Sequence, residues 1–196
     1  EGVDACDRVR DADEGHAAID RAAVEPQAIA VLDESALTGE PHPPARIVIV
    51  DPRRTTTVAA CEAEVGNDRV LHLAIESGTD LALFNAILTH IAERGWQDKA
   101  FIGASTKDFD KALAANRTSL ADAAAITGLR AEDIAKAAAW IAEPKEGRRR
   151  RTMFCYEKGL IWGNDNYRTN AALVNVALAT GNIGRPGAGV YTWAGN

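Results

Sequence analysis

The pattern of apolar and polar positions predicts buried strands alternating with helices from residue 45 onward. Residues 45–52 read ARIVIVDP, a short β-branched run closed by Asp-Pro, as expected of a buried strand that ends at a loop. The run DRVLHLAI at 68–75 predicts a second strand, and the apolar residues 152–156 predict a third. Between the first two strands, RTTTVAACEAE at 54–64 indicates a short helix.

The helical pattern is strongest in SGTDLALFNAILTHIAERGW, residues 77–96. This stretch opens with a capping-type Ser/Thr/Asp cluster and stops at Gly95. One helical face carries Leu81, Phe84, Ile87, Leu88 and Ile91. Residues 98–143 also read as helices separated by Asn, Ser and Gly. Within them, 119–141 have the outline of a helix-turn-helix, but two packed helices suit an acidic chain without a basic recognition helix better.

Strands that alternate with helices predict the α/β class, with a layered, mostly parallel sheet and flanking helices. In such sheets ligands collect beyond the carboxyl ends of the strands. Three loops are expected at that edge: DPRRT at 51–55, SGTD at 77–80 and the polar stretch 157–166.

The N-terminal segment has a different character. Residues 1–45 hold eleven acidic and three basic residues, and the first aromatic of the chain is Phe84. Apart from a weak apolar stretch at 28–32, residues 1–44 show no sustained period, so we expect them to be disordered or translated out of frame. The last residues, 190–196, are expected to be out of frame as well. Residues 45–196 are then expected to form the α/β region.

Bulk properties exclude some classes of function. The 196 residues carry a net charge of −6, which gives no general attraction to nucleic acid. No run of about 18 apolar residues is present, so no transmembrane segment is predicted, and the first residues do not read as a signal peptide. Three distant cysteines fit neither a metal knuckle nor a disulfide framework, and Cys61 and Cys155 read as small buried residues.

The three loops carry the chemistry of a nucleotide-like ligand. Arg53 or Arg54 can hold a phosphate by a bidentate fork, and the amides around Gly78 and Thr79 lie at a helix start. Asp51 or Asp80 can accept from ribose hydroxyls or a guanine amino edge, although Asp80 could equally be a helix N-cap and Asp51 could merely end its strand. No G-x-G-x-x-G follows a strand and no Walker lysine motif is present, so a standard nicotinamide or ATP site is not supported.

In combination, these stretches resemble a known family. IVIVDPRRT, DRVLHLAIESGTDLALFNAILTHI, GWQDKAFI and residues 150–189 are together similar to the molybdopterin-binding large subunit of bacterial arsenite oxidases, members of the dimethyl-sulfoxide-reductase family. YEKGLIWGNDNYRT, residues 156–169, is the narrowest of these motifs. The resemblance runs from about residue 39 to 189 and covers a minor part of a full large subunit.

The resemblance implies a cofactor and residues that hold it. The cofactor is molybdenum carried by two molybdopterin guanine dinucleotides, and loops at strand ends clasp its nucleotide arms. The resemblance places Asp51, Arg53, Thr55, Gly78, Thr79 and Asp80 on a guanosine diphosphate portion, and Tyr156, Lys158 and Gly159 near a pterin. Asn164, Asp165 and Asn166 are expected to be satisfied by the cofactor or by each other.

The implied activity is oxidation of arsenite to arsenate, with oxygen from water. In this subfamily no protein side chain ligates the metal, and no catalytic or metal-binding residue is assigned to the chain. An iron–sulfur cluster is expected only in a full-length parent, as is electron transfer to a small Rieske subunit and onward to a cytochrome c or copper protein. The family location is periplasmic. Alternatives are a formate dehydrogenase or nitrate reductase type, or a non-catalytic nucleotide-binding module.

Overall fold

The computed structural model describes residues 27–32, 45–163 and 165–192. Five strands form its sheet: β1 Gln27–Leu32, β2 Arg46–Val50, β3 Val70–Leu73, β4 Arg151–Tyr156 and β5 Gly189–Thr192. The helices are α1 Thr56–Val65, the short 3-10 helix η4 Asn67–Arg69, α2 Asp80–Glu93, α3 Lys99–Ser105, α4 Phe109–Ala115, α5 Leu120–Thr127, α6 Ala131–Ala142, α7 Lys158–Ile161 and α8 Asn166–Ala179.

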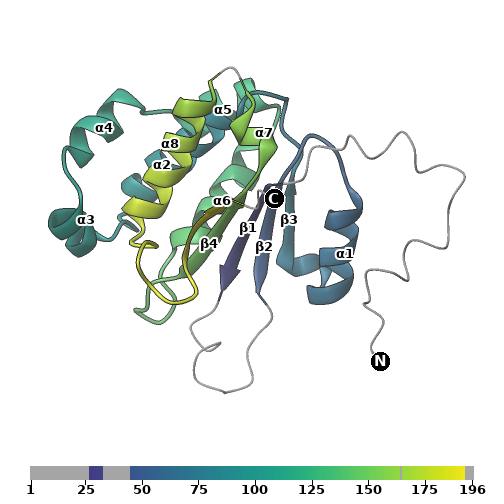
Figure 1. The fold of residues 1–196 in the computed structure, drawn as a ribbon, viewed down its shortest axis with the longest axis horizontal. Helices are drawn as coiled ribbons and strands as arrows, with labels where there is room; N and C mark the ends of the chain where they lie inside the picture. Colours follow the sequence, from purple (N-terminus) through teal and green to yellow (C-terminus); the bar gives the residue numbers. More distant parts are fainter. Residues whose placement is uncertain (1–26, 33–44, 164, 193–196) are drawn as a thin grey trace, which may run out of the picture.

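The sheet has the strand order β3-β2-β1-β4-β5. The pairs β2–β3 and β4–β5 are parallel, whereas β1 runs antiparallel to both β2 and β4. Four of the five described strands therefore point the same way, which confirms the α/β class and the mostly parallel sheet. Their carboxyl ends meet at the upper edge of the sheet in Figure 1.

Strand β1 lies inside the segment for which composition predicts disorder. Its six residues pair with β2 on one side and with β4 on the other, so for Gln27–Leu32 the prediction is wrong and the sheet does not begin at residue 45. The rest of residues 1–44 lies outside the described residues, as do Asn164 and residues 193–196. For the rest of residues 1–44, disorder or an altered reading frame stays a prediction, and for residues 193–196 an altered reading frame does.

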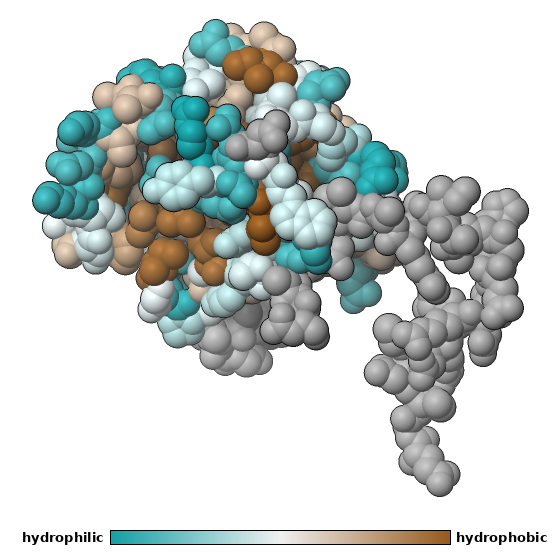
Figure 2. Space-filling model, turned by 45° about the horizontal axis from the view of Figure 1, so that its top comes forward, coloured by the Kyte–Doolittle hydropathy of each residue, from teal (hydrophilic) through white to brown (hydrophobic). Residues whose placement is uncertain are grey.

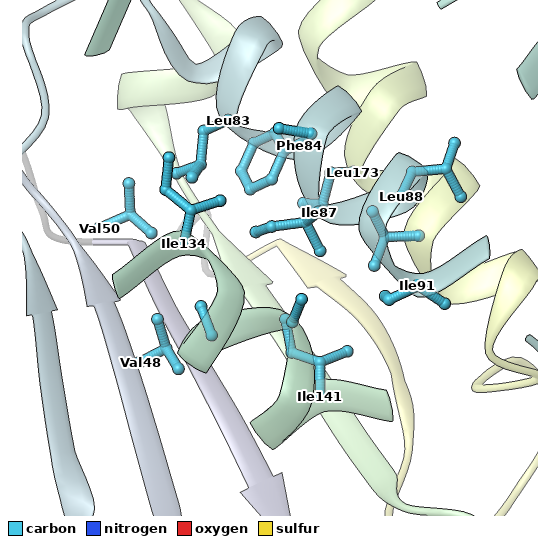
Figure 3. Packing of buried hydrophobic residues seen from close by; sticks show 14 of the residues in the cluster. Val48, Val50, Leu83, Phe84, Ile87, Leu88, Ile91, Ile134, Ile141 and Leu173 are labelled. Carbon is cyan, nitrogen blue, oxygen red and sulfur yellow. The ribbon is translucent and has the colours of Figure 1, made fainter. Parts of the chain in front are cut away.

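Helices cover the two faces of the sheet unequally. Helices α2, α5, α6 and α8 lie on one face, and α1 lies on the other (Figure 1). The large helical layer and the sheet enclose the main core, in which Val48 and Val50 of β2 lie beside α6 with its Ile134 and Ile141, and α2 with Leu83 and Ile87 lies beyond (Figure 3). A smaller cluster under α1 consists of Ile49, Val58 and Val70 with partly buried neighbours.

Helix α2 is central to the helical layer because it packs against α5, α6 and α8. Its predicted apolar face is confirmed: Phe84, Ile87, Leu88 and Ile91 are buried, and Leu81 packs against the core from its edge. Each such side chain contributes roughly 1.5–3 kcal/mol when it leaves water.

Helices α5 and α6, the predicted helix-turn-helix outline, both pack against α2, with Gly128 at the turn at a φ of +73°. This pair is part of the core packing, as the acidic composition indicates. Helices α3 and α4 lie at the periphery, and α3 contacts α8. No helix in the described ranges has both the length and the apolar character needed to cross a bilayer.

Both cysteines of the described chain are free thiols. Cys155 is buried in β4, and Cys61 is half-buried beside the small cluster under α1. Burial raises the pKa of the Cys61 thiol. The prediction of a small buried side chain is confirmed for Cys155, whereas Cys61 is only partly buried.

Candidate functional site at the carboxyl edge of the sheet

Asp51 ends β2 and is fixed by the backbone around it. Its side chain is only 3% exposed, and its Oδ1 accepts a hydrogen bond from the backbone N–H of Arg53 at 2.7 Å. Its own N–H donates to the carbonyl oxygen of Leu73, and its carbonyl oxygen lies 2.9 Å from Nε2 of His72. Asp51 therefore shapes the turn, while the Arg53 side chain is 55% exposed, with its Nε 3.9 Å from Oδ1 of Asp51.

The two neighbouring arginines, Arg53 and Arg54, differ in how closely their guanidinium groups are paired with carboxylates of the chain. Arg54 donates from both terminal nitrogens to the carboxylate of Glu62 in α1. This hydrogen bond lowers the pKa of Glu62 and raises that of Arg54. The guanidinium fork of Arg54 is thus engaged, so Arg53 is the better candidate of the pair for an anionic ligand.

Thr55 follows these arginines at the N-cap position of α1. Its extended backbone suits that position, but its side chain caps no helical N–H. The hydroxyl oxygen is buried and finds no hydrogen-bond partner in the described chain. A buried polar atom of this kind costs roughly 1–3 kcal/mol unless a partner outside the described residues satisfies it.

The second loop follows β3 and leads into α2. Gly78 has a φ of +83°, and a Cβ placed there would meet no atom within 4 Å, so the backbone faces open space. Thr79 occupies the N-cap position, yet its hydroxyl donates to the carbonyl oxygen of Glu76 at 2.6 Å instead of capping α2. Asp80 is the first residue of the helix, so the alternative that it is the N-cap is wrong.

The third loop begins directly after β4. Glu157 is 1% exposed, and its Oε1 lies 3.1 Å from Nζ of Lys158. Its Oε2 is buried without a hydrogen-bond partner among the described residues. Nζ of Lys158 also lies 5.6 Å from the ring centre of Trp162. Tyr156 packs against the core, and Gly159 lies within α7.

The register of the sheet relates the first and third loops. Gln27 of β1 pairs with Val50, and continuing the antiparallel pairing of β1 with β4 by two residues puts Gln27 opposite Tyr156. The next residues, Asp51 and Glu157, are therefore level with each other on either side of β1. Two strand spacings separate them, about 10 Å.

The sheet thus brings all three predicted loops to one edge, the second beside the first because β2 and β3 are neighbours. Sequence analysis did not single out Glu157 as a site residue. The available signal was a carboxylate directly after an apolar strand, and its burial became visible only in the fold.

The polar residues that follow have a simpler explanation than a ligand. Asp165 and Asn166 are exposed, so their burial penalty does not arise. The Asn166 side chain donates to the carbonyl oxygen of Ile161 and thereby joins α7 to α8. The expectation that the cofactor satisfies them is not needed for these two residues, and Asn164 lies outside the described residues.

The glycine-rich stretch after α8 lies at the opposite edge of the sheet. Gly181 turns the chain there at a φ of +65°. Asn182 is completely buried, accepts from the backbone N–H of Thr152 at 3.1 Å and donates to the hydroxyl of Thr180 at 2.8 Å. These bonds tie the end of α8 to the start of β4, so the stretch has a structural role.

The arginines at 149–151, around the start of β4, also bond to other parts of the chain. Arg149 pairs with Asp98 at 3.1 Å, and Arg150 donates to the carbonyl oxygen of Glu143. Arg151 donates to the carbonyl oxygen of Pro186. These contacts hold the loop to its own chain and fit a structural role better than a nucleic-acid contact.

The surface between α7 and α8 has a shallow apolar groove. Its volume is about 440 Å³, and it is lined by Ile161, Asn166, Tyr167, Asn170, Ala171 and Val174. Two strongly exposed aromatics lie nearby, Trp162 at 74% and Tyr167 at 83%. Figure 2, which turns the upper edge forward, shows apolar patches among hydrophilic residues on this side of the molecule. Within the described ranges, no three His, Cys, Asp or Glu side chains gather as metal ligands.

The chain is similar to proteins of known family. The chain is 46% identical over 159 residues to arsenite oxidase subunit AioA of Herminiimonas arsenicoxydans, which covers 81% of this chain and 19% of that protein. It is 38% identical over 176 residues to iodate reductase subunit IdrA of Denitromonas iodatirespirans, covering 72% of this chain and 19% of that protein. The chain therefore spans about a fifth of the length of these curated relatives.

The fold also has a solved counterpart in acetylene hydratase from Pelobacter acetylenicus. The TM-score is 0.57 at 22% identity, over 71% of this chain and 18% of that chain, which supports the fold alone. The family model for molybdopterin oxidoreductases matches residues 24–194. The match is wider at both ends than the motifs indicate, and it includes β1. The chain belongs to the molybdopterin oxidoreductase family.

Proposed function

We propose that the chain is part of the catalytic subunit of a molybdenum-dependent arsenite oxidase, which oxidises arsenite to arsenate. The observation that carries the proposal is the 46% identity to an arsenite oxidase subunit, compared with 38% to an iodate reductase subunit. The stretch YEKGLIWGNDNYRT, the narrowest of the motifs, lies in the third loop of the site and supports the same choice.

The residues at the sheet edge fit a molybdenum cofactor with a guanine dinucleotide arm. Arg53 is exposed where a phosphate could be held, and the backbone at Gly78 faces open space. The buried Thr55 hydroxyl and Glu157 Oε2 have no hydrogen-bond partner among the described residues. A ligand rich in phosphates, hydroxyls and ring N–H groups would supply what these atoms lack.

Each loop then has a role in binding. Asp51, Arg53, Thr55, Gly78, Thr79 and Asp80 would hold the guanosine diphosphate portion of one dinucleotide, and Tyr156, Lys158 and Gly159 would lie near a pterin. When bound, the molybdenum centre supplies two-electron chemistry with oxygen drawn from water. The described residues bind and orient the cofactor, and none of them is assigned to arsenite.

The remaining features of the proposal concern a full-length parent. They are an iron–sulfur cluster, a small Rieske subunit, a cytochrome c or copper-protein acceptor, and a periplasmic location. They follow from the likeness to arsenite oxidase, and the described residues carry no feature of their own for them.

The test uses the full-length protein encoded by the reading frame that contains this chain. Purified protein is analysed for molybdenum and for guanine released on cofactor hydrolysis, and then assayed with arsenite, iodate, nitrate and formate. We expect stoichiometric molybdenum with guanine, and dye reduction that depends on arsenite. Molybdenum with turnover only on iodate, nitrate or formate would replace arsenite as the substrate. If the purified protein never contains molybdenum, the result would favour the alternative of a non-catalytic nucleotide-binding module.

A further inference from the structure

In the buried carboxylate of Glu157, one oxygen is paired and the other has no hydrogen-bond partner among the described residues. Oε1 faces the Lys158 ammonium at 3.1 Å, whereas Oε2 is buried without a donor among the described residues. A carboxylate oxygen only accepts hydrogen bonds when ionised. Leaving it unsatisfied in a residue that is 1% exposed is costly, because a charged group loses more on desolvation than a neutral one.

The missing partner must therefore be a donor, and the position of Glu157 limits where it comes from. The residue is the first after β4, at the carboxyl edge where open α/β sheets bind their ligands. A ring carbonyl cannot take this place because it only accepts hydrogen bonds, and a phosphate would also set negative charge against the carboxylate. An N–H or amino group can.

Lys158 places a hydrogen-bond donor next to the acceptor oxygens of Glu157. Its side chain is 45% exposed, and its ammonium donates but cannot accept. Side by side, Glu157 and Lys158 present an acceptor next to a donor. An amino-pyrimidinone edge, as found in pterin and in guanine, presents an amino group, a ring N–H and a carbonyl oxygen in a row. Its two donors suit Glu157, and its carbonyl suits Lys158.

We propose that Glu157 and Lys158 together recognise an amino-pyrimidinone edge, with Oε2 of Glu157 accepting from the amino group and ring N–H. The inference rests on the proposed cofactor and adds Glu157 to the residues that hold it. Glu157 also positions Lys158 through its other oxygen.

The test measures binding of paired probes to the purified 196-residue chain by fluorescence or calorimetric titration. Pterin is compared with lumazine, in which an oxygen replaces the 2-amino group, and guanosine monophosphate with inosine monophosphate, which lacks the amino group. We expect the unchanged chain to prefer the amino-bearing member of at least one pair by about tenfold. The pair that is discriminated identifies the ring, pterin or guanine.

Variants then assign the preference to Glu157. Glu157→Gln should bind both members of that pair about equally, while its midpoint of urea unfolding stays at or above that of the unchanged chain. The matched control is Glu93→Gln, which removes a carboxylate from an exposed ion pair at the far end of α2 and should keep the preference. The comparison on the unchanged chain does not depend on how a variant folds.

The outcomes separate this inference from the proposed function. Equal binding within both probe pairs, or no binding of any probe, would overturn the role of Glu157. A preference that survives in Glu157→Gln would overturn it too. Neither result affects whether the full-length protein holds molybdenum and oxidises arsenite, which the separate metal analysis and assays decide.

Discussion

Gly181 offers the sharpest test of the packing at the end of α8. Its φ is +65°, and a Cβ built there would lie 2.7 Å from Oδ2 of Asp98. Asp98 cannot easily move away, because Oδ1 accepts from the backbone N–H of Phe101 at 2.9 Å. Oδ2 in turn lies 3.1 Å from Nε of Arg149. We therefore expect Gly181→Ala to destabilise the chain through both its backbone and its new methyl group.

The size of the effect follows from these contacts. A left-handed conformation costs a residue other than glycine about 1–2 kcal/mol. Displacing Asp98 would weaken the N-cap of α3, worth about 1 kcal/mol, and an ion pair worth at most about 1 kcal/mol at this exposure. Gly181→Ala should thus lower the free energy of unfolding by about 2–4 kcal/mol. Gly184 has a similar φ of +71° with no atom within 4 Å, so Gly184→Ala should lose only the backbone part, about 1–2 kcal/mol.

Urea unfolding followed by circular dichroism compares the two variants at one pH. A second check is the double variant Asp98→Ser with Gly181→Ala, since serine can keep the N-cap but lacks Oδ2, the atom of Asp98 that would lie nearest the new methyl group. Its loss should be smaller than the sum of the single losses. Equal losses for Gly181→Ala and Gly184→Ala, or strict additivity in the double variant, would refute the reasoning.

Three further predictions concern the fold and the site. Asn182→Ala should lower the free energy of unfolding by about 2–4 kcal/mol, because it leaves the buried N–H of Thr152 without its acceptor; a loss below about 1 kcal/mol would contradict this. Burial lowers the pKa of His90 from its usual value of 6.5, so the stability linked to it is present above that value and is lost as the pH falls through the folded-state pKa. Between about pH 7.5 and 5 the unchanged chain should lose more stability in urea titrations than His90→Gln, and parallel losses would exclude this role. In the full-length protein, Asp80→Ala should lower molybdenum occupancy, with a cost of about 1–3 kcal/mol in cofactor binding; parental occupancy would remove Asp80 from the site.

The regular elements after residue 45 could be predicted because their signals are local. The β-branched run at 47–50 and the apolar face of α2 each depend on neighbouring residues, and both appear in the structure. Strand β1 could not be predicted in this way. Its six residues lie in an acidic, aromatic-free segment, and their strand conformation depends on partners as distant as β4.

The candidate site was predictable to the level of its loops. A strand followed by a polar loop marks the edge where ligands collect, which is why Asp51 could be named from the pattern. Lys158 was named only through the resemblance to the arsenite oxidases. Which side chain is buried and which atom lacks a partner depends on packing between distant segments. The hydrogen bond from Arg54 to Glu62 and the unpartnered oxygen of Glu157 could therefore be recognised only in the structure.

The antiparallel strand β1 has a practical consequence for anyone who shortens this chain. Among the described strands, β1 alone pairs with both β2 and β4, and so joins the pair β2–β3 to the pair β4–β5. Composition would suggest a shortened version that begins at residue 45, but such a version would lack β1. It would expose two long apolar edges, one on β2 and one on β4, whose unpaired N–H and C=O groups template pairing with other molecules. Such a version should accumulate in inclusion bodies, while versions that keep residues 27–32 remain in solution.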